Sequence, residues 1–368
     1  MKVWELMQIM EDIAPAHLAE EWDHVGLEVG DLNQDVHRIL ITLDADPRVI
    51  EEAISKRVNL IITHHPMFFR AVKNLLWHQP LGKMVYQLIK NDIALFSAHT
   101  NLDITNGGTN DYLAELLGLT DVTVLAETKE EELFKLVVFV PVNYLDQVRD
   151  AISEAGAGHI GNYSHCTFAA PGEGSFMPLA DTNPFVGKQG ELEKTPEYRL
   201  ETIVPASLLN QVIMAMKSSH PYEEVAYDLY KTNVPGAVDG LGRVGSLPQP
   251  VTLNQLADKV KKLLGVNSLR VVGEGARLIS RVAVCSGSGM SLLKNAHNKG
   301  AQCFLTGDMK YHEAQEALAQ QIAVIDADHF ATEGIFVPRF ATLLKNKISQ
   351  DEVTILTSEI NTNPWRFY

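Results

Sequence analysis

The sequence predicts an α/β protein in which two related α/β halves flank an inserted ferredoxin-like α+β domain. One pattern of strand, short loop, helix, strand and polar corner begins at Arg38 and again at Arg281. Between these repeats the order of strands and helices changes, and 368 residues exceed what one hydrophobic core usually supports. We therefore expect three domains, at residues 1–126, 127–234 and 235–368, with the two outer ones sharing a site.

The two repeats run in register without a gap: Arg38 aligns with Arg281 and Thr63 with Thr306 at the same offset of 243 residues. Each is followed by one more apolar strand, in IALFSAHTNLD and IAVIDADHFATE. Strands such as NLIIT are apolar without alternation, which is typical of strands that helices cover on both faces. Ligands collect beyond the carboxyl ends of such strands. The polar sequences THHP, AHTNLD, TGDMK and DADHFATE all fall there, so we expect one shared site.

The inserted segment has the order strand, helix, strand, strand, helix, strand, which is the ferredoxin-like order. Its expected strands are LFKLVVFVP, NYSHCTFAA, YRLETIVP and VAYDLYK, and its expected helices run from Tyr144 to Ala155 and from Leu208 to Met216. The segment PGAVDGLGRVGSLPQP is rich in Gly and Pro and is predicted to be the connection back into the second half.

Composition disfavours several classes of protein. No apolar run approaches the ~20 residues that cross a bilayer, and the first residues lack a basic region and a cleavage site, which predicts neither a membrane span nor export. The three cysteines form no C-x-x-C pair and fit a reducing compartment, so we expect a cytoplasmic protein. A formal net charge of −15, with 31 scattered Lys and Arg residues, disfavours nucleic acid as the main partner.

Two motifs contain candidate metal ligands. His64 and His65 follow the strand NLIIT, and adjacent side chains diverge in a strand, which suits ligands to two different metal ions. They could equally be surface histidines in ordinary hydrogen bonds. His329 and Glu333 stand four residues apart and share one face of a predicted helix. A His and a Glu at a helix start can also form a hydrogen bond without any metal.

The duplication brings further residues to the same cleft. It places DADHFATE where AHTNLD lies in the first half, and therefore brings Asp103 and His99 towards the histidines. Mixed nitrogen and oxygen donors suit zinc, manganese or iron and disfavour calcium. Two such divalent ions need a bridging group and activate water near neutral pH, and Glu333 is the candidate bridge and catalytic residue. The full candidate ligand set is His64, His65, Asp103, His329 and Glu333.

Other polar residues are expected around these ligands. His99 is a second catalytic candidate, because it would lie near the metal ions and contact the substrate or orient Asp103. The residues Asp308, Lys310 and His312 occupy the remaining corner. They have two interpretations, as the capped start of a helix or as contacts to a substrate.

With these residues in view, the chain resembles the Nif-three-like family, whose members are named GTP cyclohydrolase 1 type 2 homologues. The family usually has Asn at the position of His24 and often Gly at that of Asp328, and neither position is a metal ligand. The matching motifs are EEWDHVGL at 20–27, THHP at 63–66, SAHTNLD at 97–103, GLGRVG at 240–245, TGDMKYHEA at 306–314 and DADHFATE at 326–333.

The resemblance implies a Nif-three-like fold and a dinuclear metal site. In that site His64 and Asp103 would bind one ion, His65 and His329 the other, and Glu333 both. The inserted segment, with SHPYEEVAYDLY, is similar to the CutA or PII-like domain that some bacterial members contain. Such domains trimerise and family members assemble as hexamers, so we expect a homohexamer.

The resemblance also implies a reaction. Activated water would attack C8 of guanine in GTP, open the imidazole ring and release formate to give dihydroneopterin triphosphate. The residues alone support only a dinuclear hydrolase with a small-molecule or nucleotide substrate, so a phosphoesterase or another nucleotide hydrolase stays open. A further alternative is a metal-binding hexameric regulatory or chaperone-like protein whose inserted domain senses a small molecule.

Overall fold

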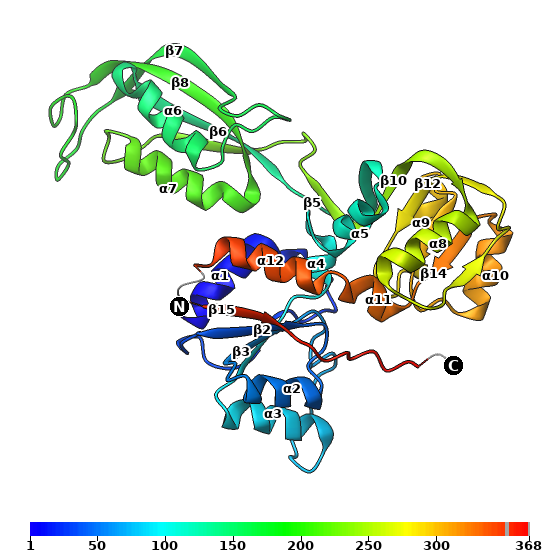
Figure 1. The fold of residues 1–368 in the computed structure, drawn as a ribbon. Coiled ribbons are helices and arrows are strands. Elements are labelled where there is room, and N and C mark those ends of the chain that lie inside the picture. Colours follow the sequence, from blue (N-terminus) through cyan, green and yellow to red (C-terminus); the bar gives the residue numbers. More distant parts are fainter. Residues whose placement is uncertain (350–352, 367–368) are drawn as a thin grey trace. The chain divides into compact units, whose positions relative to one another are not determined.

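The protein, described by a computed structural model for residues 1–349 and 353–366, forms two compact units (Figure 1). The first unit combines Met1–Lys129 with Asp239–Tyr368. The second unit is the single segment Glu130–Val238. The N-terminal and C-terminal segments therefore both contribute to the unit that contains the polar corners THHP and DADHFATE.

The first sheet of the larger unit has the strand order β1-β4-β3-β2-β15. Strands β2, β3, β4 and β15 are parallel, and β1 is antiparallel to β4. Helices α1 and α12 pack on one face of this sheet and α2 and α3 on the other, which explains the uninterrupted apolar strands. The strands are β1 Gly26–Val29, β2 Arg38–Thr42, β3 Leu60–Thr63, β4 Ala94–Ser97 and β15 Thr354–Thr357; the helices are α1 Val3–Ile13, α2 Pro47–Ser55, α3 Pro80–Lys90 and α12 Val337–Lys347.

The second sheet repeats this arrangement with the order β11-β14-β13-β12-β10-β5. Strands β12, β13 and β14 are parallel and β11 is antiparallel to β14, as β1 is to β4. Helices α5 and α8 cover one face, and α9 and α10 the other. The strands are β5 Thr120–Glu130, β10 Val238–Thr252, β11 Arg270–Val272, β12 Leu278–Val284, β13 Cys303–Thr306 and β14 Ala323–Asp326; the helices are α5 Thr109–Leu117, α8 Leu253–Leu264, α9 Leu293–Asn298 and α10 Tyr311–Ala319.

The two halves of the larger unit exchange elements. After β4 the chain leaves the first sheet, so that α5 packs on the second sheet and β5 joins it. After β14 the chain returns, so that α12 packs on the first sheet and β15 pairs with β2 (Figure 1). Each half therefore contains elements from both ends of the sequence, and the segments that cross between the halves begin directly at the predicted site.

The segment PGAVDGLGRVGSLPQP was predicted to be the connection back into the second half. Most of it belongs to the 15-residue strand β10. Strand β10 lies between β12 and β5, and pairing on both sides holds it extended. Tertiary contacts thus outweigh the low strand propensity of glycine and proline.

The second unit has an antiparallel sheet in the order β7-β8-β6-β9. Helices α6 and α7 pack on one face through residues such as Val138 and Leu200, which leaves Phe139 and Arg199 on the opposite face. The predicted strand NYSHCTFAA starts later than expected, at Thr167, and continues through the Gly- and Pro-containing stretch to Phe176. The elements are β6 Leu133–Pro141, α6 Leu145–Glu154, β7 Thr167–Phe176, β8 Glu193–Pro205, α7 Leu209–Ser219 and β9 Tyr227–Lys231.

The remaining regular elements are short. Helices α4 and α11 follow β4 and β14, and the described residues contain no helix with the length and hydropathy that a membrane span requires. The bounds are α4 Thr100–Ile104, α11 His329–Gly334 and the 3₁₀ helices Ala16–Leu18, Val142–Tyr144, Ala206–Leu208 and Met290–Leu292.

A buried arginine of the GLGRVG motif joins the two halves. Arg243 is 2% exposed, and its Nε and Nη2 donate to the two carboxylate oxygens of Asp111 at 2.6 and 2.8 Å. Its Nη2 also donates to the carbonyl of Ile104 at 3.1 Å. Arg243 thereby fixes the connection between α4 and α5, one residue beyond Asp103.

We predict that Arg243→Ala lowers the free energy of unfolding by about 3 kcal/mol, because breaking a buried ion pair leaves unpaired groups in the interior. Urea denaturation followed by tryptophan fluorescence measures the change. The matched control is Arg48→Ala, since Arg48 forms a more exposed pair with Asp46 and should change stability by less than about 1 kcal/mol. Equal effects of the two substitutions would contradict the prediction.

Candidate metal centre

The predicted ligands converge at the carboxyl ends of three strands. His64 and His65 directly follow β3, which ends at Thr63. Asp103 lies in α4 after β4, and His329 and Glu333 lie in α11 after β14. The structure thus brings together all five residues from the two halves, and the metal assignment itself stays a prediction.

The carboxylate of Glu333 is the centre of this cluster. It is 4% exposed, and its Oε2 lies 2.9 Å from Nε2 of His65 and 3.0 Å from Nε2 of His329. Its Oε1 lies 3.8 Å from Nε2 of His64, which is 3.6 Å from Oδ2 of Asp103. Two ligand groups that could each hold a metal ion therefore share Glu333: one with His65 and His329, the other with His64 and Asp103.

The cluster also contains buried polar atoms without hydrogen-bond partners among the described residues, namely Nε2 of His64 and Oε2 of Glu333. The short contacts of Oε2 with the histidine nitrogens lack the geometry of hydrogen bonds. Buried polar groups are normally satisfied, because leaving one unpaired costs about 1–3 kcal/mol. Imidazole nitrogens and carboxylate oxygens that converge without satisfying one another fully are the arrangement that a metal ion satisfies, so these residues fit a metal centre.

Glycine at position 287 leaves space for the Glu333 carboxylate. Gly287 has a φ of +59°, and a Cβ built on it would lie only 2.1 Å from Oε1 of Glu333. Its N–H donates to Oγ1 of Thr332 at 3.0 Å, in the helix that carries Glu333. Any other residue here would push the carboxylate away from the histidines.

The histidine rings are held by hydrogen bonds at Nδ1. The Nδ1 atoms of His65 and His329 lie 2.7 Å from the carboxylates of Asp44 and Asp308, respectively. Nδ1 of His64 lies 2.9 Å from the carbonyl oxygen of Ala98. These contacts leave each Nε2 facing the cluster, which is the arrangement that typically orients metal-ligating histidines.

Asp308 and its neighbours had two interpretations in the sequence. Asp308 contacts His329, whereas α10 begins after Lys310, whose N–H donates to Glu313 at 2.6 Å. His312 is exposed on α10, where it contacts Gln315. Asp308 thus orients His329, whereas Lys310 and His312 lie at the start of a helix.

Both halves hold Asp103. Ser286, in the loop after β12, donates from Oγ to the Asp103 carboxylate at 3.2 Å. Asn110 donates to the Asp103 carbonyl at 3.0 Å and accepts from the Ser286 N–H at 2.9 Å. The position of this carboxylate therefore depends on contact between the two halves.

His99 adjoins the cluster but is oriented by a residue that the sequence prediction missed. Nδ1 of His99 lies 3.0 Å from Oδ1 of Asp23, and Oδ2 of Asp23 accepts from the N–H and the hydroxyl of Thr100. Burial alone would raise the pKa of Asp23, but the hydrogen bonds of His99 and Thr100 lower it to about 2. The His99 ring lies 5.2 Å from the His64 ring. The His99 ring is thus held by an ionised carboxylate. Among the described residues no side-chain hydrogen bond joins His99 to Asp103, although the Asp103 N–H donates to the His99 carbonyl at 3.1 Å.

Asp328 has a backbone conformation that favours glycine. Its φ is +75°, a conformation that glycine adopts most easily, although Asp tolerates it better than most residues. Its carboxylate accepts from the N–H of Phe330 at 2.8 Å and caps α11. This cap partly offsets the backbone strain and starts the helix that carries His329 and Glu333.

Two signals in the sequence could have revealed the orienting carboxylates. Asp44 follows the strand RILIT in the polar corner LDAD, which is the first-half counterpart of the loop that contains Gly287. Asp23 lies inside the motif EEWDHVGL. Thr362, whose hydroxyl donates to the Asp44 carboxylate, comes from the far end of the chain and leaves no such signal.

The buried carboxylates shift the pKa values of the histidines. Burial opposes protonation of His65, but Asp44 and Glu333 outweigh it and raise its pKa to about 10. Burial also opposes protonation of His329, and Glu333 and Asp308 raise its pKa to about 9. Burial would raise the pKa of Glu333, yet the neighbouring histidines hold it well below its usual range. The site therefore concentrates negative charge that protons neutralise when no metal ion is bound.

The mixed α/β architecture with several sheets is a NIF3-like fold. A solved structure titled as a Bacillus cereus protein related to NIF3 matches with a TM-score of 0.92 and 42% sequence identity, covering 100% of this chain and 99% of that one. The Staphylococcus aureus protein SA1388 matches with a TM-score of 0.77 and 30% identity, covering 100% and 99%.

The chain belongs to the Duf34/NIF3 (NGG1p interacting factor 3) family, whose model matches residues 1–364. A curated relative from Bacillus subtilis, named GTP cyclohydrolase 1 type 2 homolog, is 44% identical over 367 residues, which is 99% of this chain and 98% of the relative. A relative from Halalkalibacterium halodurans with the same name is 44% identical over 366 residues, 98% of each chain. The family resemblance expected from the motifs is confirmed.

We predict that a divalent metal ion binding at this cluster at pH 7 displaces about two protons per chain, from His65 and His329, because ligands must be deprotonated. Both histidines have pKa values above 7 in the metal-free protein, so metal affinity should rise as the pH rises towards 9. Calorimetric titration with zinc in buffers of different ionisation enthalpy counts the protons. His329→Ala should release about one proton fewer; an unchanged count would contradict the assignment.

Proposed function

We propose that this protein is a dinuclear, metal-dependent hydrolase. The observation that carries the proposal is the buried carboxylate of Glu333, which belongs to two of the three groups of candidate ligands among the described residues; the third group is His64, His65 and His99. The donor set of imidazole and carboxylate groups suits zinc, manganese or iron. Divalent ions bound there would polarise a substrate atom and lower the pKa of a water molecule.

His99 is the proposed general base. Asp23 stays ionised at neutral pH, since its pKa is about 2, and it accepts a hydrogen bond from Nδ1 of His99. Nε2 of His99 then has a free lone pair and can accept a proton from the attacking water. General bases typically contribute about 10²–10⁴-fold to a rate. His65 and His329 are partly exposed, so a substrate can reach the cluster from their side.

Two exposed aromatic residues beside His99 favour a substrate with a flat ring. Trp22 and Phe69 are 55% and 58% exposed, and their ring centroids lie 5.7 Å apart. The centroids lie 5.9 and 6.3 Å, respectively, from that of His99. A purine base stacked there would lie next to the ligand cluster. We therefore propose GTP as the substrate, with water added at C8 of guanine and formate released as the imidazole ring opens.

A regulatory function is the second candidate, and a feature of the inserted unit supports it. The unit has β-α-β-β-α-β order and contains a large cavity of its own, lined entirely by residues of Glu130–Val238. We propose that it is a ferredoxin-like domain of the CutA or PII kind, supported by this element order and by the antiparallel sheet. The homohexamer and the cytoplasmic location expected from the sequence stay predictions.

Metal content tests the dinuclear site. The wild-type protein, purified without chelators, should contain about two divalent ions per chain by mass spectrometry of the elements. His64→Ala should lose about one ion and Glu333→Ala most of both, because Glu333 is the shared ligand. His312→Ala is the matched control and should retain wild-type content. Low metal that is the same in all four proteins would mean that the histidines are structural.

Formate release from GTP tests the reaction. The metal-loaded protein should release formate, and His99→Ala should lower kcat by about 100-fold or more while metal content stays unchanged. Trp22→Ala should raise KM for GTP by about 5- to 100-fold through lost stacking. Trp77→Ala is the matched control, since Trp77 is also exposed, at 70%, but contacts Tyr86. Phosphate release without formate would replace the cyclohydrolase hypothesis by a phosphoester hydrolase.

A further inference from the structure

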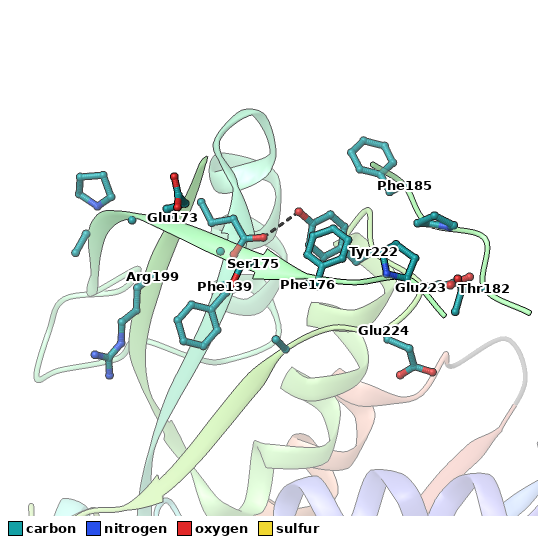
Figure 2. Close-up of a pocket in the computed structure, with 18 residues that line it drawn as sticks. Phe139, Glu173, Ser175, Phe176, Thr182, Phe185, Arg199, Tyr222, Glu223 and Glu224 are labelled. Atoms are coloured by element: carbon teal, nitrogen blue, oxygen red, sulfur yellow. Dashed lines mark hydrogen bonds between the residues drawn. The ribbon is translucent and has the colours of Figure 1, made fainter. Parts of the chain in front are cut away.

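The inserted unit contains a cavity of about 640 Å³ on the face of its sheet that the helices leave open (Figure 2). Strands β6, β7 and β8 form its floor, and residues between β7 and β8 and between α7 and β9 form its walls. Its volume is within the range of small-molecule sites. Apolar rings dominate the lining, and four aromatic residues contribute them: Phe139, Phe176, Phe185 and Tyr222.

A buried carboxylate lies among these rings. Glu197 is 7% exposed, and its Oε1 accepts a hydrogen bond from the Tyr222 hydroxyl at 2.9 Å, drawn as the dashed line in Figure 2. Burial and the neighbouring Glu197 raise the pKa of Tyr222 to about 12, so the hydroxyl remains a neutral donor. A single hydrogen bond from a neutral hydroxyl does not offset the free-energy cost of burying a charged carboxylate.

No cation of the described residues 1–349 and 353–366 forms an ion pair with Glu197. The nearest basic residue of the lining, Arg199, pairs with Glu201 at 3.1 Å, and its guanidinium points away from the Tyr222 hydrogen bond (Figure 2). Glu173, at the rim, already pairs with Lys194 at 2.8 Å. Glu197 is therefore a buried acidic group of the cavity without a positive partner among the described residues, whereas Glu223 and Glu224, which also line the cavity, are exposed to solvent.

Glycine at position 174 makes this position of the carboxylate possible. A Cβ built on Gly174 would lie 2.1 Å from Oε2 of Glu197. Glycine in the interior of a strand weakens it and often marks the close approach of another group. Strand β7 thus has no side chain at the position where the Glu197 carboxylate lies.

We propose that this cavity binds an organic monocation, an alkylammonium or methylated ammonium group, with Glu197 as the counter-ion and the aromatic rings around its apolar part. Ammonium groups are attracted both to carboxylates and to the faces of aromatic rings. A divalent metal ion would need several oxygen or nitrogen ligands rather than one carboxylate among rings. An anion would be repelled by Glu197. The proposal is independent of the metal-dependent hydrolase function.

Calorimetric titration of the full-length protein with n-butylammonium and with tetramethylammonium chloride tests the proposal. At least one should bind with a Kd below about 1 mM, while sodium chloride and n-butanoate should not bind. Glu197→Gln keeps the shape and the Tyr222 contact and should weaken binding at least tenfold. Gly174→Ala keeps the charge but displaces the carboxylate and should also weaken binding. Glu173→Gln is the matched control and should bind within twofold of the wild type.

The two cations distinguish the mode of recognition. Preference for n-butylammonium indicates a hydrogen bond to Glu197, and preference for tetramethylammonium indicates recognition by the ring faces; both support the proposal. Failure of the wild type to bind either cation would overturn it. Equal binding by wild type and Glu197→Gln, with both proteins folded by near-ultraviolet circular dichroism, would also overturn it. These outcomes would not bear on the cyclohydrolase proposal, since the candidate metal ligands and His99 lie in the other unit.

Discussion

The carboxylate of Glu333 is buried where the two halves of the larger unit meet, and its charge constrains the residues around it. A buried carboxylate is costly unless positive charge and hydrogen bonds surround it. Three histidines supply the nitrogen atoms closest to it. His329 follows the same strand as Glu333, whereas His64 and His65 follow strand β3 of the other half. A fold that failed to bring β3 next to the start of α11 would leave the carboxylate without compensation.

The exchange of elements between the halves makes this arrangement stable. Asp103 lies in α4, and the chain continues from there into α5 on the second sheet; His329 and Glu333 lie in α11, and the chain continues into α12 on the first sheet. The candidate ligands Asp103, His329 and Glu333 therefore occupy the crossing points. Arg243 and Asn110 fix one crossing by hydrogen bonds to the backbone carbonyls of Ile104 and Asp103, respectively. Packing of both sheets thus holds the ligand geometry, and neither half alone could form the site.

The sequence predicted the strands and the convergence of the candidate ligands well because both leave regular signals. The uninterrupted apolar strands, the offset of 243 residues between the repeats and the polar corners at strand ends follow from parallel sheets covered on both faces. The contacts at Nδ1 of the histidines were missed because their partners have no fixed spacing: Asp23 and His99 are 76 residues apart. Strand β10 was missed because its glycines and prolines suggest a loop, whereas its two neighbouring strands hold it extended.

In both units a glycine lies against a buried carboxylate, but the residues around the carboxylate differ. In each, a glycine without a Cβ admits a carboxylate into a buried position: Gly287 beside Glu333 and Gly174 beside Glu197. Around Glu333 the neighbours are imidazole nitrogens whose lone pairs converge, which suits a small, strongly polarising metal ion. Around Glu197 the neighbours are aromatic rings and a neutral hydroxyl, which suit a larger and more weakly hydrated cation. The carboxylate sets the sign of the ligand's charge in both places, and the side chains around it determine the kind of cation.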